Sequence, residues 1–142
     1  MPRAKPASCF WIYMLECEDG SYYTGYTRNL VRRYRQHVDG KASVRYTRSH
    51  PPVRLAQCWR LFDSVGTALK VELFIKRRPR PIKNRLVENP TELGPLVSRM
   101  LSRQLRIYTA DPRAVEGESI AMSQEDIKNG HDPFADAPAA DL

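Results

Sequence analysis

The chain has 142 residues, of which 42% are hydrophobic and 27% are charged, so it can form one domain around one buried core. Its formal net charge of +7 is unevenly distributed: residues 111–142 contain eight acidic and two basic residues, a charge of −6, which leaves +13 for residues 1–110. A basic body favours a polyanionic partner, whereas three cysteines without CxxC or Cys/His spacing exclude a disulfide framework and a zinc site.

No apolar run has the length of a membrane span. The short apolar run of residues 9–15 stops at Glu16 and is assigned to a strand rather than to a signal peptide. We therefore expect a cytoplasmic protein that does not bind membranes. Residues 1–8, which contain two prolines and two basic side chains, are predicted to form a flexible basic arm.

The next segment is predicted to form an antiparallel β-hairpin. Two runs rich in aromatic and β-branched residues, 11–17 and 21–27, flank the turn dipeptide Asp19-Gly20. Because side chains alternate along a strand, Tyr13 and Tyr23 can meet across this hairpin.

A helix with dense positive charge is predicted after the hairpin. Asn29 can cap it, apolar residues recur at helical spacing from Leu30 to His37, and arginines fan around it at positions 32, 33 and 35. The basic loop that follows suits contacts with a nucleic-acid backbone and stacking on a base, although a solvated connector with a buried tyrosine has the same composition. The predicted nucleic-acid-binding residues of this loop, together with one residue further along the chain, are Lys41, Arg45, Tyr46, Arg48 and Lys83.

The remainder of the domain is predicted to add one strand and two helices. Residues 53–62 alternate as a third strand, and Asp63 or Ser64 can cap a helix that runs to about Arg77. Two prolines end that helix, and residues 82–88 can form a last short one. The order ββαβαα predicts an α+β domain over residues 9–88, with a small three-stranded antiparallel sheet flanked by helices.

Two further segments follow this domain. Residues 89–109 are predicted to contain an additional amphipathic helix, because apolar residues recur at helical spacing after Pro95. This helix, residues 92–107, can dock on the domain or bind a protein partner. In residues 110–142, proline, glycine, alanine and acidic residues prevail, which is the composition of a disordered acidic tail.

The predicted hairpin carries a pair of tripeptides, Trp11-Ile12-Tyr13 and, ten residues after Tyr13, Tyr23-Thr24-Gly25. They resemble the paired motifs of the GIY-YIG nuclease superfamily, with tryptophan in place of the first glycine. The basic loop further resembles the small single-domain bacterial branch of that family. The resemblance covers residues 10–87, and it matches four further positions in order: Arg33, His37, Glu72 and Asn84.

The resemblance implies hydrolysis of phosphodiester bonds in DNA. Tyr13 would be the general base, with Tyr23 as the alternative, Arg33 would stabilise the negative charge of the transition state, and His37 would share the handling of protons. A phenol has an ordinary pKa of about 10, so we expect Arg33 and a metal ion to depress the pKa of Tyr13.

The same resemblance implies Mg²⁺ or Mn²⁺ as the cofactor. Because a hard divalent cation keeps most of its waters, Glu72 could be its only protein ligand, and Asn84 would position neighbouring groups. The alternative for Glu72 is an ordinary helix ion pair, since Lys70 and Lys76 lie nearby in the chain.

Three interpretations of the function stay open. An endonuclease that selects structured or damaged DNA sites agrees with a chain that has no appended sequence-reading module. A nucleic-acid-binding module that does not cleave is the alternative, which the missing first glycine favours. A scaffold whose residues 92–107 recruit a protein partner is the third, and RNA stays an alternative to DNA.

Overall fold

The computed structural model of the protein describes residues 8–41 and 44–135. The predicted basic arm, residues 1–8, lies outside the described residues except for Ser8. The elements in chain order are β1 (Cys9–Cys17), β2 (Tyr22–Thr27), α1 (Leu30–Val38), α2 (Arg45–Ser49), β3 (Pro52–Phe62), α3 (Val65–Lys76), α4 (Arg80–Glu88), a 3-10 turn (Pro90–Glu92), α5 (Leu93–Leu101), β4 (Ile107–Thr109), α6 (Pro112–Ala121) and α7 (Gln124–Asn129).

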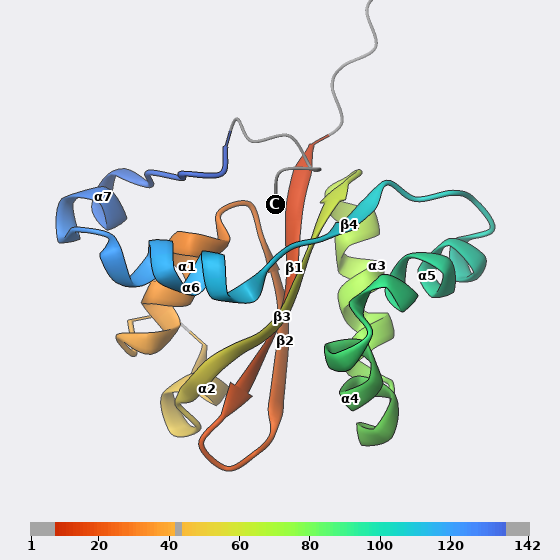
Figure 1. The fold of residues 1–142 in the computed structure, drawn as a ribbon, viewed down its shortest axis with the longest axis horizontal. Coiled ribbons are helices and arrows are strands. Elements are labelled where there is room, and N and C mark those ends of the chain that lie inside the picture. Colours follow the sequence, from red (N-terminus) through yellow and green to blue (C-terminus); the bar gives the residue numbers. More distant parts are fainter. Residues whose placement is uncertain (1–7, 42–43, 136–142) are drawn as a thin grey trace, which may run out of the picture.

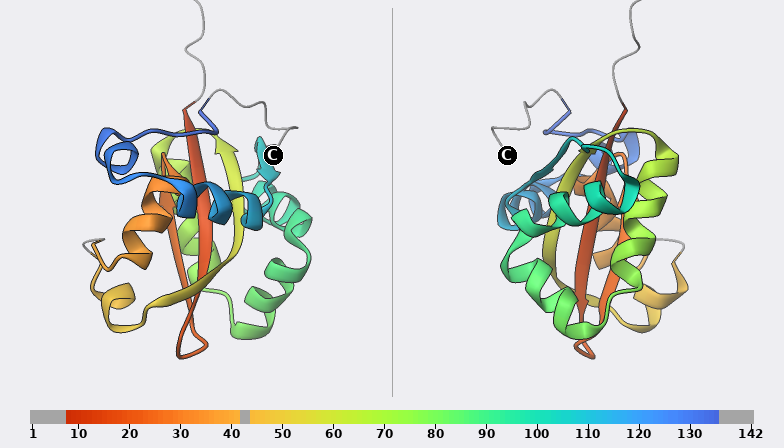
Figure 2. Two further views of the ribbon diagram at one scale, coloured as in Figure 1. Left: turned by 60° about the vertical axis from the view of Figure 1, so that its left-hand side comes forward. Right: turned by 90° about the vertical axis from the view of Figure 1, so that its right-hand side faces the viewer.

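An antiparallel sheet in the strand order β2-β1-β3-β4 forms the middle layer of the molecule (Figure 1). Helices α3, α4 and α5 cover one face of the sheet, and α1 and α6 cover the other (Figure 2). The predicted α+β class is confirmed, but the sheet has four strands instead of three. The fourth strand, β4, has only three residues, too few to show an alternating pattern, and it pairs with the end of β3 through Trp59 and Leu61.

The central strand β1 is buried on both faces, and its alternation divides the core into two clusters. The even-numbered residues from Phe10 to Met14 belong to the cluster under α3, α4 and α5. The odd-numbered residues from Trp11 to Leu15 belong to the cluster under α1 and α6. Tyr13 therefore faces α1, the helix on which the predicted catalytic arginine and histidine lie.

The segment predicted as one helix over residues 92–107 forms a shorter helix and a strand. Helix α5 ends where Ser102 adopts a left-handed conformation, with φ of 54°. Leu93 and Val97 are fully buried, so this helix docks on its own domain. Leu96 and Met100 are exposed, and the predicted partner contact through this helix stays a prediction.

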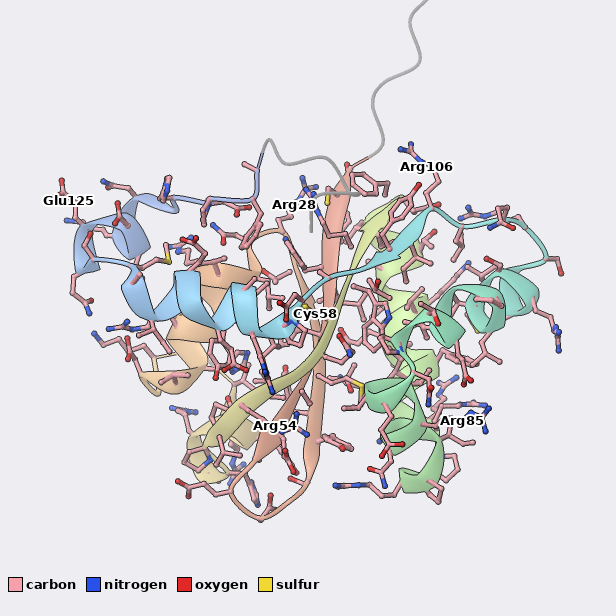
Figure 3. The ribbon with its side chains drawn as sticks, in the orientation of Figure 1. Arg28, Arg54, Cys58, Arg85, Arg106 and Glu125 are labelled. Atoms are coloured by element: carbon pink, nitrogen blue, oxygen red, sulfur yellow. The ribbon has the colours of Figure 1, made fainter. Side chains whose placement is uncertain are left out.

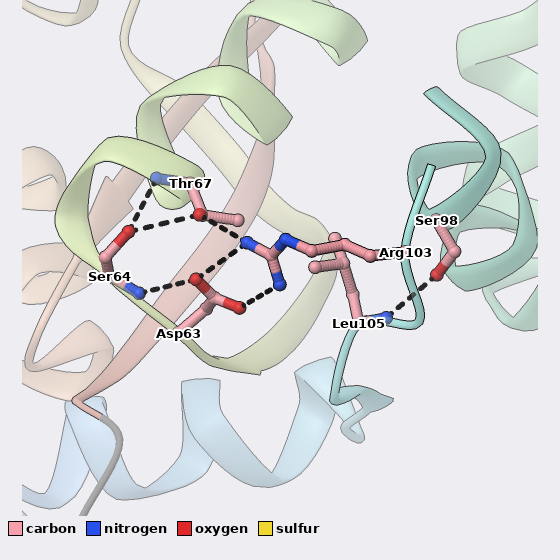
Figure 4. A network of polar contacts seen from close by, with 6 residues as sticks. All are labelled: Asp63, Ser64, Thr67, Ser98, Arg103 and Leu105. Atoms are coloured by element: carbon pink, nitrogen blue, oxygen red, sulfur yellow. Dashed lines mark hydrogen bonds and ion pairs between the residues drawn. The ribbon is translucent and has the colours of Figure 1, made fainter. Parts of the chain in front are cut away.

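The turn after α5 is tied to the start of α3 (Figure 4). The Arg103 guanidinium donates to both carboxylate oxygens of Asp63, at 2.7 and 3.1 Å, and to Oγ1 of Thr67 at 3.0 Å. These bonds hold the pKa of Asp63 well below its usual range, with the Arg103 bond as the main cause. Ser64 caps α3 by accepting from the Thr67 amide. The α3 helix, which carries Glu72, is thus fixed at its N-terminus.

The prediction of a disordered acidic tail over residues 110–142 is wrong for the described part. Helix α6 packs on α1, where Ser119 Oγ donates to the Val31 carbonyl at 2.8 Å and Val115 is fully buried. Beyond α7, the Phe134 ring packs edge-on against Trp11, with centroids 5.8 Å apart. A few apolar residues at helical spacing are sufficient to form this helix, because they pack on the face of the sheet that α1 also covers. Residues 136–142 lie outside the described residues.

None of the helices in the described ranges is long and apolar enough to cross a membrane.

Candidate active site

Tyr13 and His37 form a buried hydrogen-bonded pair between β1 and α1. Each side chain is 1% exposed, and Oη of Tyr13 lies 2.9 Å from Nε2 of His37. The other ring nitrogen, Nδ1, lies 2.9 Å from Oγ1 of Thr47, whose hydroxyl donates to the Val44 carbonyl. Because that hydroxyl is already a donor, Nδ1–H of His37 donates to it, and Nε2 is left to accept the hydrogen of Tyr13.

Gly25 provides the space in which the Tyr13 ring lies. The two residues are paired across β1 and β2, and a Cβ atom at position 25 would lie 2.6 Å from Oη and 2.7 Å from Cζ of Tyr13. The last residue of the second tripeptide is therefore a glycine for a steric reason. The tryptophan that replaces the first glycine of the pattern, Trp11, is fully buried under the Arg60 guanidinium and Phe134.

Tyr23 lies at the edge of the same cluster. Its ring centroid is 6.3 Å from that of Tyr13 and 5.3 Å from that of His37, and it stacks on Tyr46 at 6.0 Å. The expected meeting of Tyr13 and Tyr23 across the hairpin is confirmed. Tyr23 is half-buried and reaches solvent, whereas Tyr13 is enclosed.

Arg33 on α1 completes this group. Its charge lowers the pKa of both Tyr13 and His37, so it lies within electrostatic reach of the pair. Its guanidinium donates to Oε1 of Gln36 at 3.5 Å, a weak contact that leaves it able to bind an anion.

The pKa values of the pair differ from what the sequence led us to expect. Burial raises the pKa of Tyr13 further than Arg33 lowers it, so the expected depression is not present in the protein by itself. Burial, followed by Arg33, lowers the pKa of His37 to about 4, and the imidazole is therefore neutral at pH 7. Burial also raises the pKa of Tyr23.

Glu72 lies on α3, which covers the opposite face of the sheet from α1 (Figure 2). It is 7% exposed, and its Oε1 accepts an ion pair from Nζ of Lys76 at 2.6 Å, one helical turn away. The same ammonium lies 5.9 Å from the Tyr23 ring centroid. The negative charge of Glu72 raises the pKa of both Tyr13 and Tyr23, which places it within electrostatic reach of them.

The chemistry of Glu72 is compatible with a divalent cation. Within residues 8–41 and 44–135, no group of three or more His, Cys, Asp or Glu side chains could hold a metal ion, so a zinc-type site is absent there. A single carboxylate with several waters is an arrangement that Mg²⁺ accepts. Lys76 now neutralises this carboxylate, and its side chain is 43% exposed, so it has room to move away.

Asn84 does not join this cluster. Its Oδ1 accepts from the Tyr22 hydroxyl at 3.1 Å and from Nε of Arg80 at 3.0 Å. Tyr22 follows the opposite alternation from Tyr23 on β2 and packs against the other core cluster. Asn84 thus holds α4 against the β2 edge.

Two of the predicted nucleic-acid-binding residues, Tyr46 and Lys83, lie beside Tyr23. Tyr46, 38% exposed, stacks on Tyr23 and on His50, while Lys41, Arg45 and Arg48 are exposed in the loop and on α2. Lys83 lines a cavity of about 270 Å³ whose other walls are Tyr22, Tyr23, Thr24, Tyr46 and Lys76.

The sequence reasoning gave no role to Thr47 and only part of the role of Lys76. Thr47 lies next to Tyr46 in the basic loop, but nothing in the sequence places its hydroxyl on His37. Lys76 was considered only as a partner of Glu72, whereas the structure also places its ammonium over the Tyr23 ring.

Comparison with known proteins identifies the family of this chain. Residues 9–86 match the family model described as the GIY-YIG catalytic domain. A UPF0213 protein of Halalkalibacterium halodurans is 41% identical over 91 residues, which cover 59% of this chain and 95% of that protein. Another UPF0213 protein, from Cupriavidus necator, is 44% identical over 70 residues, or 49% of this chain and 74% of that protein.

A solved structure also matches. The solution NMR structure of a UPF0213 protein from Bacillus halodurans is 38% identical, covers 68% of this chain and 99% of that one, and has a TM-score of 0.37. The family model ends before α5, so α6 and α7 lie outside it. With residues 9–86 accounting for more than half of its length, the chain belongs to the GIY-YIG catalytic domain family, a family of nucleases.

Proposed function

We propose that this chain is a metal-dependent endonuclease that hydrolyses phosphodiester bonds in DNA, selecting structured or damaged sites. The observation that carries the proposal is the hydrogen-bonded pair of Tyr13 and His37 beside Arg33, within electrostatic reach of the buried carboxylate of Glu72.

The proton path follows from the hydrogen bond between Tyr13 and His37. The oxygen of a water molecule bonds to phosphorus, its proton passes to Oη of Tyr13, and the original Tyr13 proton passes to Nε2 of His37. The bond between phosphorus and the leaving oxygen breaks, and that oxygen takes a proton from solvent. This path does not need a free Tyr13 phenolate, which burial disfavours, and it needs a neutral His37, which burial favours.

Arg33 stabilises the reaction through charge. The phosphate gains negative charge as water adds, and a guanidinium aimed at its oxygens stabilises the transition state more than the ground state. Arg33 forms no ion pair with any described residue, so no carboxylate neutralises it before substrate binds.

Glu72 is the proposed ligand of Mg²⁺ or Mn²⁺. The bound ion would supply positive charge beside the phosphate and lower the pKa of a coordinated water. Lys76 forms an ion pair with this carboxylate, and its release would accompany metal binding.

A substitution at Glu72 tests the proposal. Glu72→Gln keeps the shape and removes the charge, so it should abolish Mg²⁺-dependent cleavage and leave the fold and DNA binding intact. Glu88→Gln, the same change at an exposed position of α4, is the control. The assay is single-turnover cleavage of duplex, flap, junction and single-stranded DNA and of RNA, with and without Mg²⁺. Undiminished cleavage by Glu72→Gln at saturating Mg²⁺ would exclude Glu72 as the ligand.

A module that binds nucleic acid without cutting it is the second candidate. The ion pair between Lys76 and Glu72 favours it, because a neutralised carboxylate is a poorer metal ligand. Binding to every substrate of the panel with no cleavage of any, at any divalent metal concentration, would support this candidate against the endonuclease.

A further inference from the structure

A second cavity, of about 310 Å³, is lined in part by Arg33 and shares no lining residue with the cavity beside Lys76 and Lys83. Three arginines line it, Arg28, Arg32 and Arg33, together with the polar side chains of Tyr26 and Gln36. None of the residues that line it is acidic. The family resemblance assigns a role to Arg33 alone among these three arginines.

The arginines of this cavity are not neutralised by carboxylates. Within the described residues, no ion pair is formed by any of the three. Nε of Arg32 is buried and has no hydrogen-bond partner among the described residues, and Arg28 is exposed with its guanidinium 4.8 Å above the Phe10 ring.

Other arginines of the protein are engaged differently. Arg35, Arg54, Arg85 and Arg103 each bind a carboxylate. A buried guanidinium nitrogen without a partner is costly, and an anion is the ligand that satisfies it. The cavity therefore has the charge and the open donors of an anion site.

The position of the cavity identifies the kind of anion. It adjoins Tyr26 and Thr27 at one end of the edge strand β2, whereas the cavity with Lys76 and Lys83 adjoins the other end at Tyr22 to Thr24. From Tyr23 to Thr27 the strand rises about 14 Å at roughly 3.4 Å per residue. One strand of duplex DNA carries a phosphate about every 3.4 Å along the helix axis, and neighbouring phosphates are further apart along the backbone itself, so an edge of this length can follow more than one phosphate of a strand.

We propose that the cavity of Arg28, Arg32 and Arg33 binds phosphates that flank the cleaved bond. The backbone of the nucleic acid then runs along β2, from Lys76 and Lys83, past Tyr23 and Arg33, to Arg32 and Arg28. This inference rests on the proposed function, because it extends the same substrate beyond the catalytic residues.

The C-terminal segment contacts two residues that line this subsite, Asn29 and Arg32. The Asn29 side chain donates to the carbonyls of Gly130 and His131, at 3.1 and 3.2 Å. A Cβ atom at Gly130 would lie 3.7 Å from Nη1 of Arg32. The segment after α7, which lies outside the family match, thus borders the arginine that has the unpaired nitrogen.

The salt dependence of binding tests the subsite. The double variant Arg28→Gln with Arg32→Gln is compared with a control double variant, Arg99→Gln with Arg106→Gln. The control removes the same charge from α5 and from the residue before β4. In Figure 3, Arg28 and Arg106 lie on opposite sides of β1, and β4 is the sheet edge opposite to β2. Binding of a duplex DNA is measured in EDTA, which prevents metal-dependent cutting, at salt concentrations from 50 to 200 mM.

Each lost phosphate contact should reduce the magnitude of the slope of log K against log salt by about 0.9. The slope of the double variant should therefore be smaller in magnitude by about 1.8. Over this fourfold range of salt, the affinity of the unmodified protein should then fall about 12-fold more than that of the double variant. Arg28→Gln alone changes an exposed side chain, and it should reduce the magnitude of the slope by about 0.9. The control should keep the original slope.

The outcomes separate this inference from the proposed function. A double variant with the original slope, or a control that loses as much as the double variant, overturns the subsite. A reduced slope in a protein that cuts no substrate supports the subsite and contradicts the endonuclease. No binding of DNA or RNA by the unmodified protein contradicts both.

Discussion

A methyl group at Gly25 should disable the site by displacing Tyr13. A Cβ atom there would lie 2.6 Å from Oη, 2.7 Å from Cζ and 3.0 Å from Cε1 of the Tyr13 ring. Ordinary carbon contacts are about 3.5–4.0 Å, so the ring would have to move by roughly 1 Å. Tyr13 is 1% exposed and packed against His37, which leaves it no open direction.

The size of the effect follows from this displacement. Overpacking a filled core costs about 1–3 kcal/mol of folding free energy. A shift of roughly 1 Å also stretches the 2.9 Å bond from Oη of Tyr13 to Nε2 of His37 beyond hydrogen-bonding distance. Misplacement of this size can cost about 100-fold in rate, or roughly 2.7 kcal/mol in the barrier.

Two measurements on Gly25→Ala check the reasoning: the free energy of unfolding in urea, and the single-turnover cleavage rate. Gly66→Ala is the matched control, because a Cβ atom there would meet only Oγ of Ser64, at 3.8 Å, and alanine is the better helix former. The control should be at least as stable as the unmodified protein and equally active. If Gly25→Ala kept the original stability and rate, the close approach of Tyr13 would have no functional meaning.

Three further predictions follow from the same contacts. Arg33→Ala should raise the activation barrier of cleavage by about 3 kcal/mol, measured as a fall in the single-turnover rate. If the variant changed only the affinity for substrate, Arg33 would be a binding residue and not a catalytic one. Burial lowers the pKa of His37 to about 4 from 6.5, so the unfolded chain binds more protons between these values and stability falls as the pH drops from 6.5 to 4. Urea unfolding at pH 7 and pH 4.5 should show a smaller loss for His37→Gln than for the unmodified protein, by up to about 3 kcal/mol, and equal losses would contradict the assignment. A chain that ends at Ala110 loses the buried side chains of Val115 and Met122, and the burial of each contributes about 1.5–3 kcal/mol to the free energy of unfolding. The shortened chain should therefore have a clearly lower melting temperature. An unchanged melting temperature would mean that α6 does not stabilise α1.

The features that depend on local sequence were predictable. The Asp19-Gly20 turn and the alternating strands beside it form the hairpin, and Asn29 caps α1 by accepting from the Arg32 amide. Such patterns act between residues that are close in the chain, and they brought Tyr13 and Tyr23 together. The order of the tripeptides then identified the family, which the match over residues 9–86 confirms.

Contacts between distant parts of the chain were decided by the tertiary structure. The acidic composition of residues 111–135 indicated disorder, yet α6 forms and packs on α1. This contact could not be predicted, because the two helices are far apart in the sequence. The family resemblance implied that Asn84 belongs to the site, whereas in the fold its side chain accepts a hydrogen bond from Tyr22.

The charges of the site likewise depend partly on the sequence and partly on the tertiary structure. The sequence determined which groups are present: two tyrosines, a histidine, an arginine and a carboxylate in an order that matches a nuclease family. Only the folded chain decided their states, because a pKa depends on burial and on neighbours in space. Desolvation raises the pKa of Tyr13 and keeps His37 neutral, and Lys76 forms an ion pair with Glu72. The direction of the Tyr13 hydrogen bond and the charge around Glu72 were therefore set by the tertiary structure.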